Sequence, residues 1–313
     1  MESPLQVPDR RSISVVTPVY NGEASIVELC RRLSEVLPQI ATQYEIILVN
    51  DGSRDRSWEV ISELSSHSAT VRGLNLMRNY GQHNALLCGI RAAKYELVLT
   101  IDDDLQHPPE EIPQLLARLD EGFDVVYGAP KTEQNGLMRA LASHITRLAL
   151  RAAVGSDVAK NVSAFRVFRT QLREAFANYQ SPFVSIDVLL TWATTRFGAT
   201  TVVFQPRHSG SSNYTFTKLV RHALDMMTGF STAPLQLASL IGFTCTLFGV
   251  GVFIYVFVRY CLEGSVPGFP FLASIIAIFS GAQLFALGVI GEYLARMHFR
   301  SMKRPAYVVR AMM

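Results

Sequence analysis

Three carboxylates stand side by side after an apolar segment: Asp102, Asp103 and Asp104 follow "YELVLTI" and precede "LQHPPEEI". Adjacent carboxylates at the edge of a hydrophobic core repel one another unless a positive partner relieves them. Mg²⁺ and Mn²⁺ take such oxygen ligands, usually one or two carboxylates together with phosphate oxygens and water. Glu110 and Glu111 already suit the first turn of a helix, so the three aspartates remain for another role. The sequence therefore predicts a cation site after this apolar segment.

The cation would bind the phosphates of a ligand. The chain has neither GxxxxGK[ST] nor GxGxxG after its first apolar segment, which disfavours P-loop nucleotidases and dinucleotide-dependent oxidoreductases. A nucleotide diphosphate bound without these loops can be held through a metal instead. The four cysteines show no zinc-site spacing and indicate a reducing compartment, and a net charge of +3 gives no case for nucleic acid.

Short apolar, β-branched segments alternate with helix-like segments through roughly the first two hundred residues. This pattern predicts an α/β domain, a parallel sheet with helices on both faces. Ligands of such sheets bind at the carboxyl ends of the strands. The polar segments "PVYNGE", "VNDGSRD", "IDDDLQ" and "YGAPK" each follow an apolar segment, so we expect them at one edge of the sheet. Taken alone, a segment such as "NDGSRD" would also suit a turn or a helix cap.

Two segments near the C-terminus, 235–258 and 269–290, are free of charge and each is long enough to cross a hydrocarbon core of roughly 30 Å. Both are apolar all round, which favours a transmembrane hairpin over buried core helices. Before them, residues 216–233 carry apolar side chains at helical spacing among Lys218 and Arg221, which predicts an interfacial helix, with an ordinary surface helix as the alternative.

Basic residues gather on the outer flanks of the hairpin, and Arg296, Arg300 and Arg304 follow its second segment. The positive-inside bias then predicts a multi-pass protein of the inner membrane with both termini in the cytoplasm. "MESPLQVPDRR" lacks the apolar region of a cleaved signal peptide. The expected organisation is a cytoplasmic catalytic domain at 1–215, the interfacial helix at 216–233, the membrane hairpin at 234–292 and a cytoplasmic tail at 293–313.

A set of motifs occurs in a fixed order: "PVYNGE", "VNDGSRD", "RNYGQHNALLCGI", "DDDLQHPPEEIP", "SAFRVF" and "RHSGSSNYTFTKLV", then the two apolar segments with "GEYLAR" and "RPAY". Together they resemble the polyprenyl-phosphate glycosyltransferases of glycosyltransferase family 2, among them dolichyl-phosphate mannose synthase and bacterial undecaprenyl-phosphate sugar transferases. The resemblance covers nearly the whole chain. It implies a GT-A type nucleotide-sugar-binding domain that transfers a sugar, with inversion, from a nucleotide diphosphate to a membrane lipid phosphate.

The resemblance also implies roles for individual residues. The Asp-x-Asp-x-Gln metal motif of the family falls on Asp102, Asp104 and Gln106 and implies bound Mg²⁺ or Mn²⁺. Asp102 and Asp104 are the expected catalytic residues together with Arg207, which would face the diphosphate. The expected nucleotide-sugar contacts are Pro18, Tyr20, Glu23, Asp51 and Asp103, and the expected contacts of the acceptor phosphate are Arg166, Lys131 and Ser163.

The chain departs from the family pattern at a few positions. Glu23 stands one place late in "PVYNGE", Ala164 replaces the glycine of SGFR, and Asn213 replaces the lysine of RxxGxSKY. None of these departures falls in the metal motif, and they make the donor specificity of the family harder to transfer to this chain than its fold or reaction type. Asp187 could supply a general base, although an ionised phosphate acceptor does not require one.

The predicted partners are a nucleotide diphosphate sugar, a polyprenyl phosphate lipid, the membrane and a further copy of the chain. Two other functions remain open at this point: a membrane-anchored glycosyltransferase with a polysaccharide or protein acceptor, and a catalytically silent nucleotide-binding scaffold. The sequence does not indicate which sugar or which nucleotide base is used.

Overall fold

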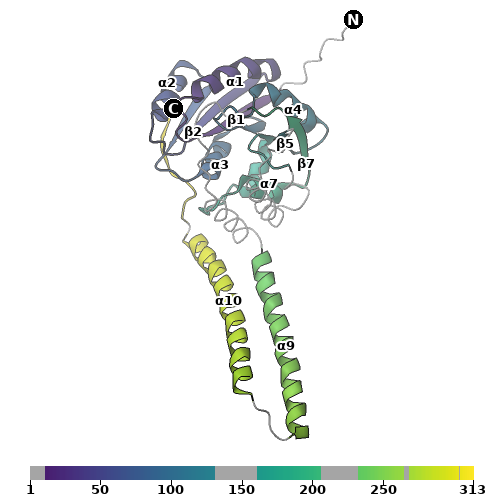
Figure 1. Ribbon diagram of the computed structural model, residues 1–313. Coiled ribbons are helices and arrows are strands. Elements are labelled where there is room, and N and C mark those ends of the chain that lie inside the picture. The colour runs from purple at the N-terminus through teal and green to yellow at the C-terminus, as the bar shows by residue number, and fades with distance from the viewer. Residues whose placement is uncertain (1–10, 131–160, 206–231, 264–267, 303) are drawn as a thin grey trace.

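The computed structural model describes residues 11–130, 161–205, 232–263, 268–302 and 304–313 (Figure 1). A single eight-stranded sheet organises the globular part, in the order β7-β5-β6-β4-β1-β2-β3-β8. The strands are β1 (Ser12–Val19), β2 (Gln43–Asn50), β3 (Val71–Leu76), β4 (Leu97–Thr100), β5 (Val125–Pro130), β6 (Arg166–Arg169), β7 (Phe197–Val202) and β8 (Val309–Met312). The helices between them are α1 (Ile26–Ile40), α2 (Ser57–His67), α3 (Gln82–Ala92), the 3-10 helix η1 (Pro109–Glu111), α4 (Ile112–Asp120), the 3-10 helix η2 (Thr170–Phe176) and α7 (Ile186–Ala193).

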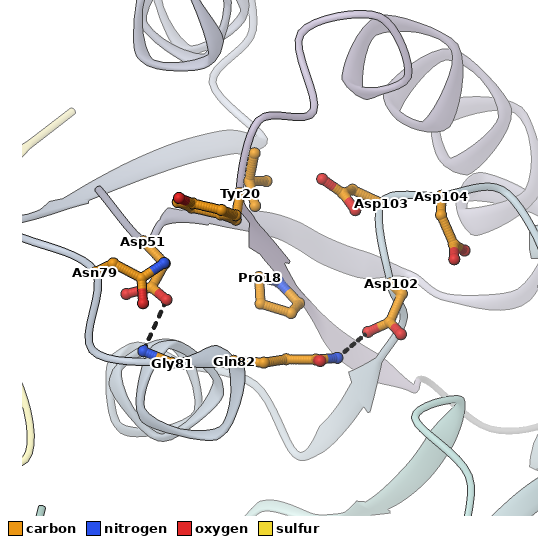
Figure 2. A pocket seen from close by; sticks show the side chains of 10 residues that line it. Pro18, Tyr20, Asp51, Asn79, Gly81, Gln82, Asp102, Asp103 and Asp104 are labelled. Carbon is orange, nitrogen blue, oxygen red and sulfur yellow. Dashed lines mark hydrogen bonds between the residues drawn. The ribbon is translucent and has the colours of Figure 1, made fainter. Parts of the chain in front are cut away.

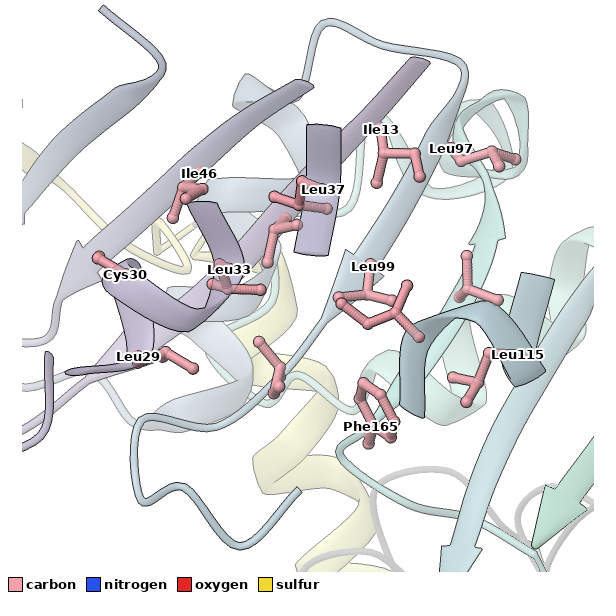
Figure 3. Packing of buried hydrophobic residues seen from close by; sticks show 14 of the residues in the cluster. Ile13, Leu29, Cys30, Leu33, Leu37, Ile46, Leu97, Leu99, Leu115 and Phe165 are labelled. Carbon is pink, nitrogen blue, oxygen red and sulfur yellow. The ribbon is translucent and has the colours of Figure 1, made fainter. Parts of the chain in front are cut away.

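The central strands are buried on both faces, as their apolar sequences predict. In β1, Ile13 and Val15 belong to the core cluster beneath α1 and α4, whereas Val16 belongs to the opposite cluster with α3 and α7. Figure 3 shows the first cluster, in which Leu33 of α1 packs over the strands. A fully buried Val, Leu or Ile side chain contributes about 1.5–3 kcal/mol relative to an exposed one. The doubly wound arrangement is therefore confirmed.

The sheet is mixed rather than wholly parallel. Strand β6 runs antiparallel to both β4 and β5, and β8 runs antiparallel to β3 at the sheet edge. Hydrophobic periodicity reports how a strand is buried but not the direction in which it runs, so this feature was not readable from the sequence. Strand β8 comes from the segment 293–313 that we expected to be a simple tail, and it instead completes the sheet.

Two long helices follow the globular part and project from it side by side, α9 (Ala233–Glu263) and α10 (Phe269–Ser301) (Figure 1). Each contains one of the expected spans and continues beyond it. The stretches Pro234–Leu262 and Ile278–His298 are long and apolar enough to cross a membrane, with mean hydropathy of 2.2 and 1.4, and none of their apolar windows is buried within the described protein. The helices pack closely where Gly249 faces Phe279, because a Cβ at Gly249 would lie 2.7 Å from that ring.

Residues 216–231 of the predicted interfacial helix lie outside the described residues, as do the boundary at residue 215, Lys131 and Arg207, whereas Ala233 already begins α9.

Candidate active site

A pocket of about 230 Å³ opens at the carboxyl ends of the central strands (Figure 2). It lies where β1, β2 and β4 end and where α3 begins, which is the edge predicted for ligand binding. These four elements are adjacent only because the strand order places β1 between β4 and β2. The pocket is lined by Pro18, Val19, Tyr20, Asp51, Asn79, Gly81, Gln82, Asp102, Asp103 and Asp104.

The three aspartates after β4 point in different directions (Figure 2). Asp102 Oδ1 accepts a hydrogen bond from the Gln82 side-chain amide at 2.7 Å, and Asp104 Oδ1 accepts one from the backbone amide of Gln106 at 3.1 Å. Asp103 instead turns toward the loop after β1. The hydrogen bonds of Asp102 and Asp104 and the divergent directions of the three side chains reduce the mutual repulsion of the carboxylates.

The backbone of both pocket loops adopts conformations that most residues avoid. Leu105, which is buried, has a φ of 59° within the acidic loop, and Asn21 has a φ of 54° after β1. A left-handed leucine is uncommon and costs about 1–3 kcal/mol, so the surrounding packing must hold it. At Gly22 a Cβ would lie 2.2 Å from Asp103 Oδ2, so glycine lets the carboxylate approach this loop closely. Gly22 is also the residue that displaces Glu23 from its usual place in the motif.

Asp51 is 2% exposed and holds the loop before α3. Its two carboxylate oxygens accept the backbone amides of Tyr80 at 2.7 Å and Gly81 at 2.8 Å. Burial raises the pKa of the Asp51 carboxyl to about 6, while the amide bonds and the charge of Arg78 act in the opposite direction. Asp51 thus connects the end of β2 to the pocket wall formed by Asn79 and Gly81.

The donor set suits a hard divalent cation that a ligand shares. Among the described residues, no three His, Cys, Asp or Glu side chains converge to hold a metal by themselves. Mg²⁺ typically uses one or two carboxylates and completes its shell with phosphate oxygens and water. Asp102 and Asp104 line the pocket and are the carboxylates available for such a role, whereas Gln106 does not line it. A metal that shares its shell with a diphosphate therefore fits the described residues, which offer no group that would hold a metal by itself.

Two predicted contacts lie near the pocket without lining it. Glu23 is exposed, and its carboxylate accepts the backbone amide of Arg56 at 2.9 Å, which ties the β1 loop to the loop before α2. Ser163 lies behind the acidic loop, with its hydroxyl 3.5 Å from His107 Nε2. Burial lowers the pKa of His107, against the effect of the Asp104 charge, so the imidazole is neutral at pH 7. Phe165 packs on this imidazole at 5.3 Å between ring centroids.

Arg166 does not face the pocket. Its side chain is 2% exposed, pairs with Asp187, and donates from Nε to the Thr100 hydroxyl at 3.1 Å. The Tyr127 hydroxyl donates to the same carboxylate at 3.0 Å. Burial, and then the charge of Asp187, raises the pKa of Tyr127 well above its ordinary value. In this arrangement Arg166 and Asp187 satisfy each other inside the core, whereas the resemblance implied that Arg166 contacts the acceptor phosphate and the sequence left a general-base role for Asp187 open.

Four pocket residues were not assigned by sequence reasoning: the buried Val19 and, around the start of α3, Asn79, Gly81 and Gln82. The signal was present, because "RNYGQHN" follows the strand "VRGLNLM" in the same way that the other polar segments follow theirs. Gly81 has a φ of 100°, a conformation natural to glycine, and it is the N-cap residue directly before α3.

Comparison with known proteins agrees with this geometry. Residues 14–177 match the family described as Glycosyl transferase family 2. The chain is similar to undecaprenyl-phosphate 4-deoxy-4-formamido-L-arabinose transferases: it is 34% identical to that of Shewanella sediminis, over 95% of this chain and 91% of the relative, and 34% identical to that of Pectobacterium carotovorum, over 97% and 94%.

Solved structures show the same fold at lower identity. Glucosyl-3-phosphoglycerate synthase from Mycobacterium tuberculosis, in complex with Mn²⁺, UDP-glucose and phosphoglyceric acid, aligns with a TM-score of 0.51 at 20% identity, covering 70% of this chain and 78% of that one. The globular part is thus a Rossmann-like domain of the GT-A type. With the family match and the nearly full-length relatives, the chain belongs to glycosyltransferase family 2.

Proposed function

We propose that this glycosyltransferase moves a sugar from a nucleotide diphosphate sugar to undecaprenyl phosphate at the cytoplasmic face of the inner membrane, with a bound divalent cation. The observation that supports it most is the pocket that Asp102 and Asp104 line at the ends of β1, β2 and β4, on a chain that continues into two exposed apolar helices. The printed name of the relatives gives undecaprenyl phosphate as the acceptor.

Different pocket residues would bind different parts of the donor. Pro18, Tyr20 and Asp51 lie on one side, where they would hold the nucleoside, and Asp102 and Asp104 lie on the other, where they would hold the cation. The cation supplies Lewis-acid stabilisation of the departing diphosphate. Asp103 would fix the distance between the two loops through its contact with Gly22. Arg207 and Lys131, outside the described residues, remain the proposed contacts of the diphosphate and the acceptor.

The acceptor requires little activation. A phosphate monoester has a second pKa of about 6 and is largely a dianion near pH 7. One of its oxygens forms the bond to the anomeric carbon while the carbon–oxygen bond to the diphosphate breaks, and that electron pair leaves with the nucleotide diphosphate. Direct displacement inverts the anomeric configuration. No general base is needed, which fits the burial of Asp187 in its pair with Arg166.

Strand β8 supports the proposed orientation. It follows α10 in the chain and pairs with β3 of the catalytic sheet, so the C-terminal segment lies on the same side as the catalytic domain. A hairpin of two spans leaves and re-enters the same side of a membrane. The basic flanks then favour the cytoplasmic side for both.

The test measures sugar transfer into organic-extractable product by the full chain in membranes with undecaprenyl phosphate. The donor panel consists of UDP- and GDP-linked sugars and begins with 4-deoxy-4-formamido-L-arabinose, the sugar in the relatives' names. We expect one donor to label the lipid, EDTA to abolish labelling, and Mn²⁺ to restore it.

We expect Asp104→Asn to lower kcat/KM by about a hundredfold or more, because a carboxylate that holds the cation is lost. Glu63→Gln, which alters an exposed residue of α2, is the matched control and should leave the rate unchanged. Donor-dependent Mn²⁺ binding, measured by electron paramagnetic resonance, should be weaker in Asp104→Asn than in the wild type or in Glu63→Gln. Nucleotide binding without lipid labelling by any donor would refute the proposed acceptor.

A further inference from the structure

A second cavity of about 280 Å³ lies next to the first, between the end of β3 and the segment that follows α10. Arg78 and Arg304 both line it, together with the amide side chains of Asn79 and Asn84. Asn79 also lines the pocket with the aspartates, so the two cavities share a wall. No carboxylate is among the described residues that line this second cavity.

The two arginines are far apart in the sequence and meet because β8 returns to the sheet. Leu76 of β3 pairs with Val309, and the Met77 amide donates to the Val308 carbonyl at 2.9 Å. This antiparallel pairing fixes the chain on either side of the cavity, so that the residue after Met77 and the residue before Pro305 line the same space. Ala306, which is buried, anchors the segment between Pro305 and the strand.

The cavity carries positive charge, of which the part from Arg78 also acts on the buried carboxylate of Asp51. Arg78 and Arg304 are exposed, and neither forms an ion pair within the described part of the chain. The Arg78 guanidinium lies 4.4 Å from the centroid of the Tyr80 ring, which restricts its orientation. Guanidinium groups bind phosphate oxygens in bidentate geometry, and side-chain amides add neutral donors. A phosphate group matches this lining.

The cavity lies at the end of α10 that leads out of the candidate span. Phe183, which lines the cavity, packs beneath the guanidinium of Arg296 at 4.9 Å, and Arg296 also pairs with Glu292 one turn earlier in α10. The apolar stretch Ile278–His298 includes both of these α10 residues. A lipid whose chain lies beside α10 would therefore bring its headgroup to the height of the cavity.

We infer that Arg78 and Arg304 form a binding site for the phosphate headgroup of a membrane lipid. The site goes beyond the proposed transfer, because its occupancy requires neither donor nor cation. Its shared wall at Asn79 places a bound headgroup beside the pocket that contains Asp51 and Asp102.

The test uses arginine modification, read residue by residue. The full chain is reconstituted in phosphatidylcholine vesicles without donor, treated with phenylglyoxal, and digested for peptide mass spectrometry. Parallel samples contain undecaprenyl phosphate, phosphatidylglycerol or inorganic phosphate. Arg310 is the internal control, because it is exposed on β8 and does not line the cavity.

Compared with vesicles of zwitterionic phosphatidylcholine alone, we expect an added anionic phosphate lipid to slow modification of Arg78 and Arg304 while Arg310 reacts at its original rate. Arg78→Gln and Arg304→Gln should each lower the affinity for the protecting lipid about tenfold, because each removes one charge-assisted contact. Arg310→Gln should leave this affinity unchanged. Protection by undecaprenyl phosphate alone would identify the acceptor, and protection by both lipids would identify a general anionic-lipid site.

Equal modification in all samples, or protection by inorganic phosphate alone, would overturn the inference. Because no sugar transfer is measured, such a result would leave the proposed function standing. Conversely, lipid protection in a chain that fails every transfer assay would support the site and not the reaction.

Discussion

Substitution of Asp187 separates two roles for Arg166, a structural ion pair and a contact with the acceptor phosphate. The Arg166 and Asp187 side chains are 2% and 6% exposed, and Tyr127 and Thr100 complete their hydrogen bonds. In Asp187→Asn the guanidinium would stay buried without a counter-charge. Removing one partner of a buried pair costs about 3–5 kcal/mol.

A loss of this size is measurable as a change in unfolding temperature. At about 2–4 °C per kcal/mol for a domain of this size, we expect Asp187→Asn to lower Tm by about 6–20 °C. The double variant Arg166→Met/Asp187→Leu should recover part of the loss, because apolar residues replace the buried pair at little cost while the buried Tyr127 hydroxyl loses its acceptor. Glu35→Gln, which breaks the exposed pair with Arg31, is the control and should shift Tm by less than about 2 °C.

The assay is thermal unfolding of the full chain in detergent, with acceptor KM measured at a temperature at which every variant is folded. An Asp187→Asn protein with unchanged Tm but a large rise in acceptor KM would refute the structural role. Such a result would instead indicate that Arg166 binds the acceptor phosphate, as the family resemblance implies.

Two further predictions concern the loop before α3. Because the folded pKa of Asp51 is raised to about 6, its contribution to stability is fully present below the unfolded pKa and is lost as pH rises through about 6. The charged carboxylate accepts both loop amides, so donor affinity, measured by titration calorimetry, should fall as pH drops below about 6. The Asp51→Asn protein should bind the donor weakly, and its affinity should not change as pH passes through about 6. Gly52→Ala should weaken donor binding about tenfold, because its Cβ would lie 2.5 Å from the backbone of Arg78 and Asn79 at a φ of 65°. Equal donor affinity in Gly52→Ala and wild type would show that the loop is not held by this contact.

Much of the fold follows from local patterns. The apolar segments ending at Val19 and Asn50 became strands buried on both faces, and the two charge-free segments became α9 and α10. Burial and length are encoded by residue type and spacing, so these features were predictable. The direction of β6 and the return of β8 were not, because strand pairing depends on contacts distant in sequence.

The candidate site divides in the same way. Sequence alone determined that carboxylates and polar loops follow the strands, and therefore that Asp51, Asp102 and Asp104 gather at one edge. Only the tertiary structure decided that Asp103 turns toward Gly22, that Arg166 is satisfied by Asp187, and that Arg78 meets Arg304. The physical reason is that periodicity and motif spacing fix which edge of the sheet a side chain reaches. Its orientation and charge partner depend on elements that pack against it from elsewhere in the chain.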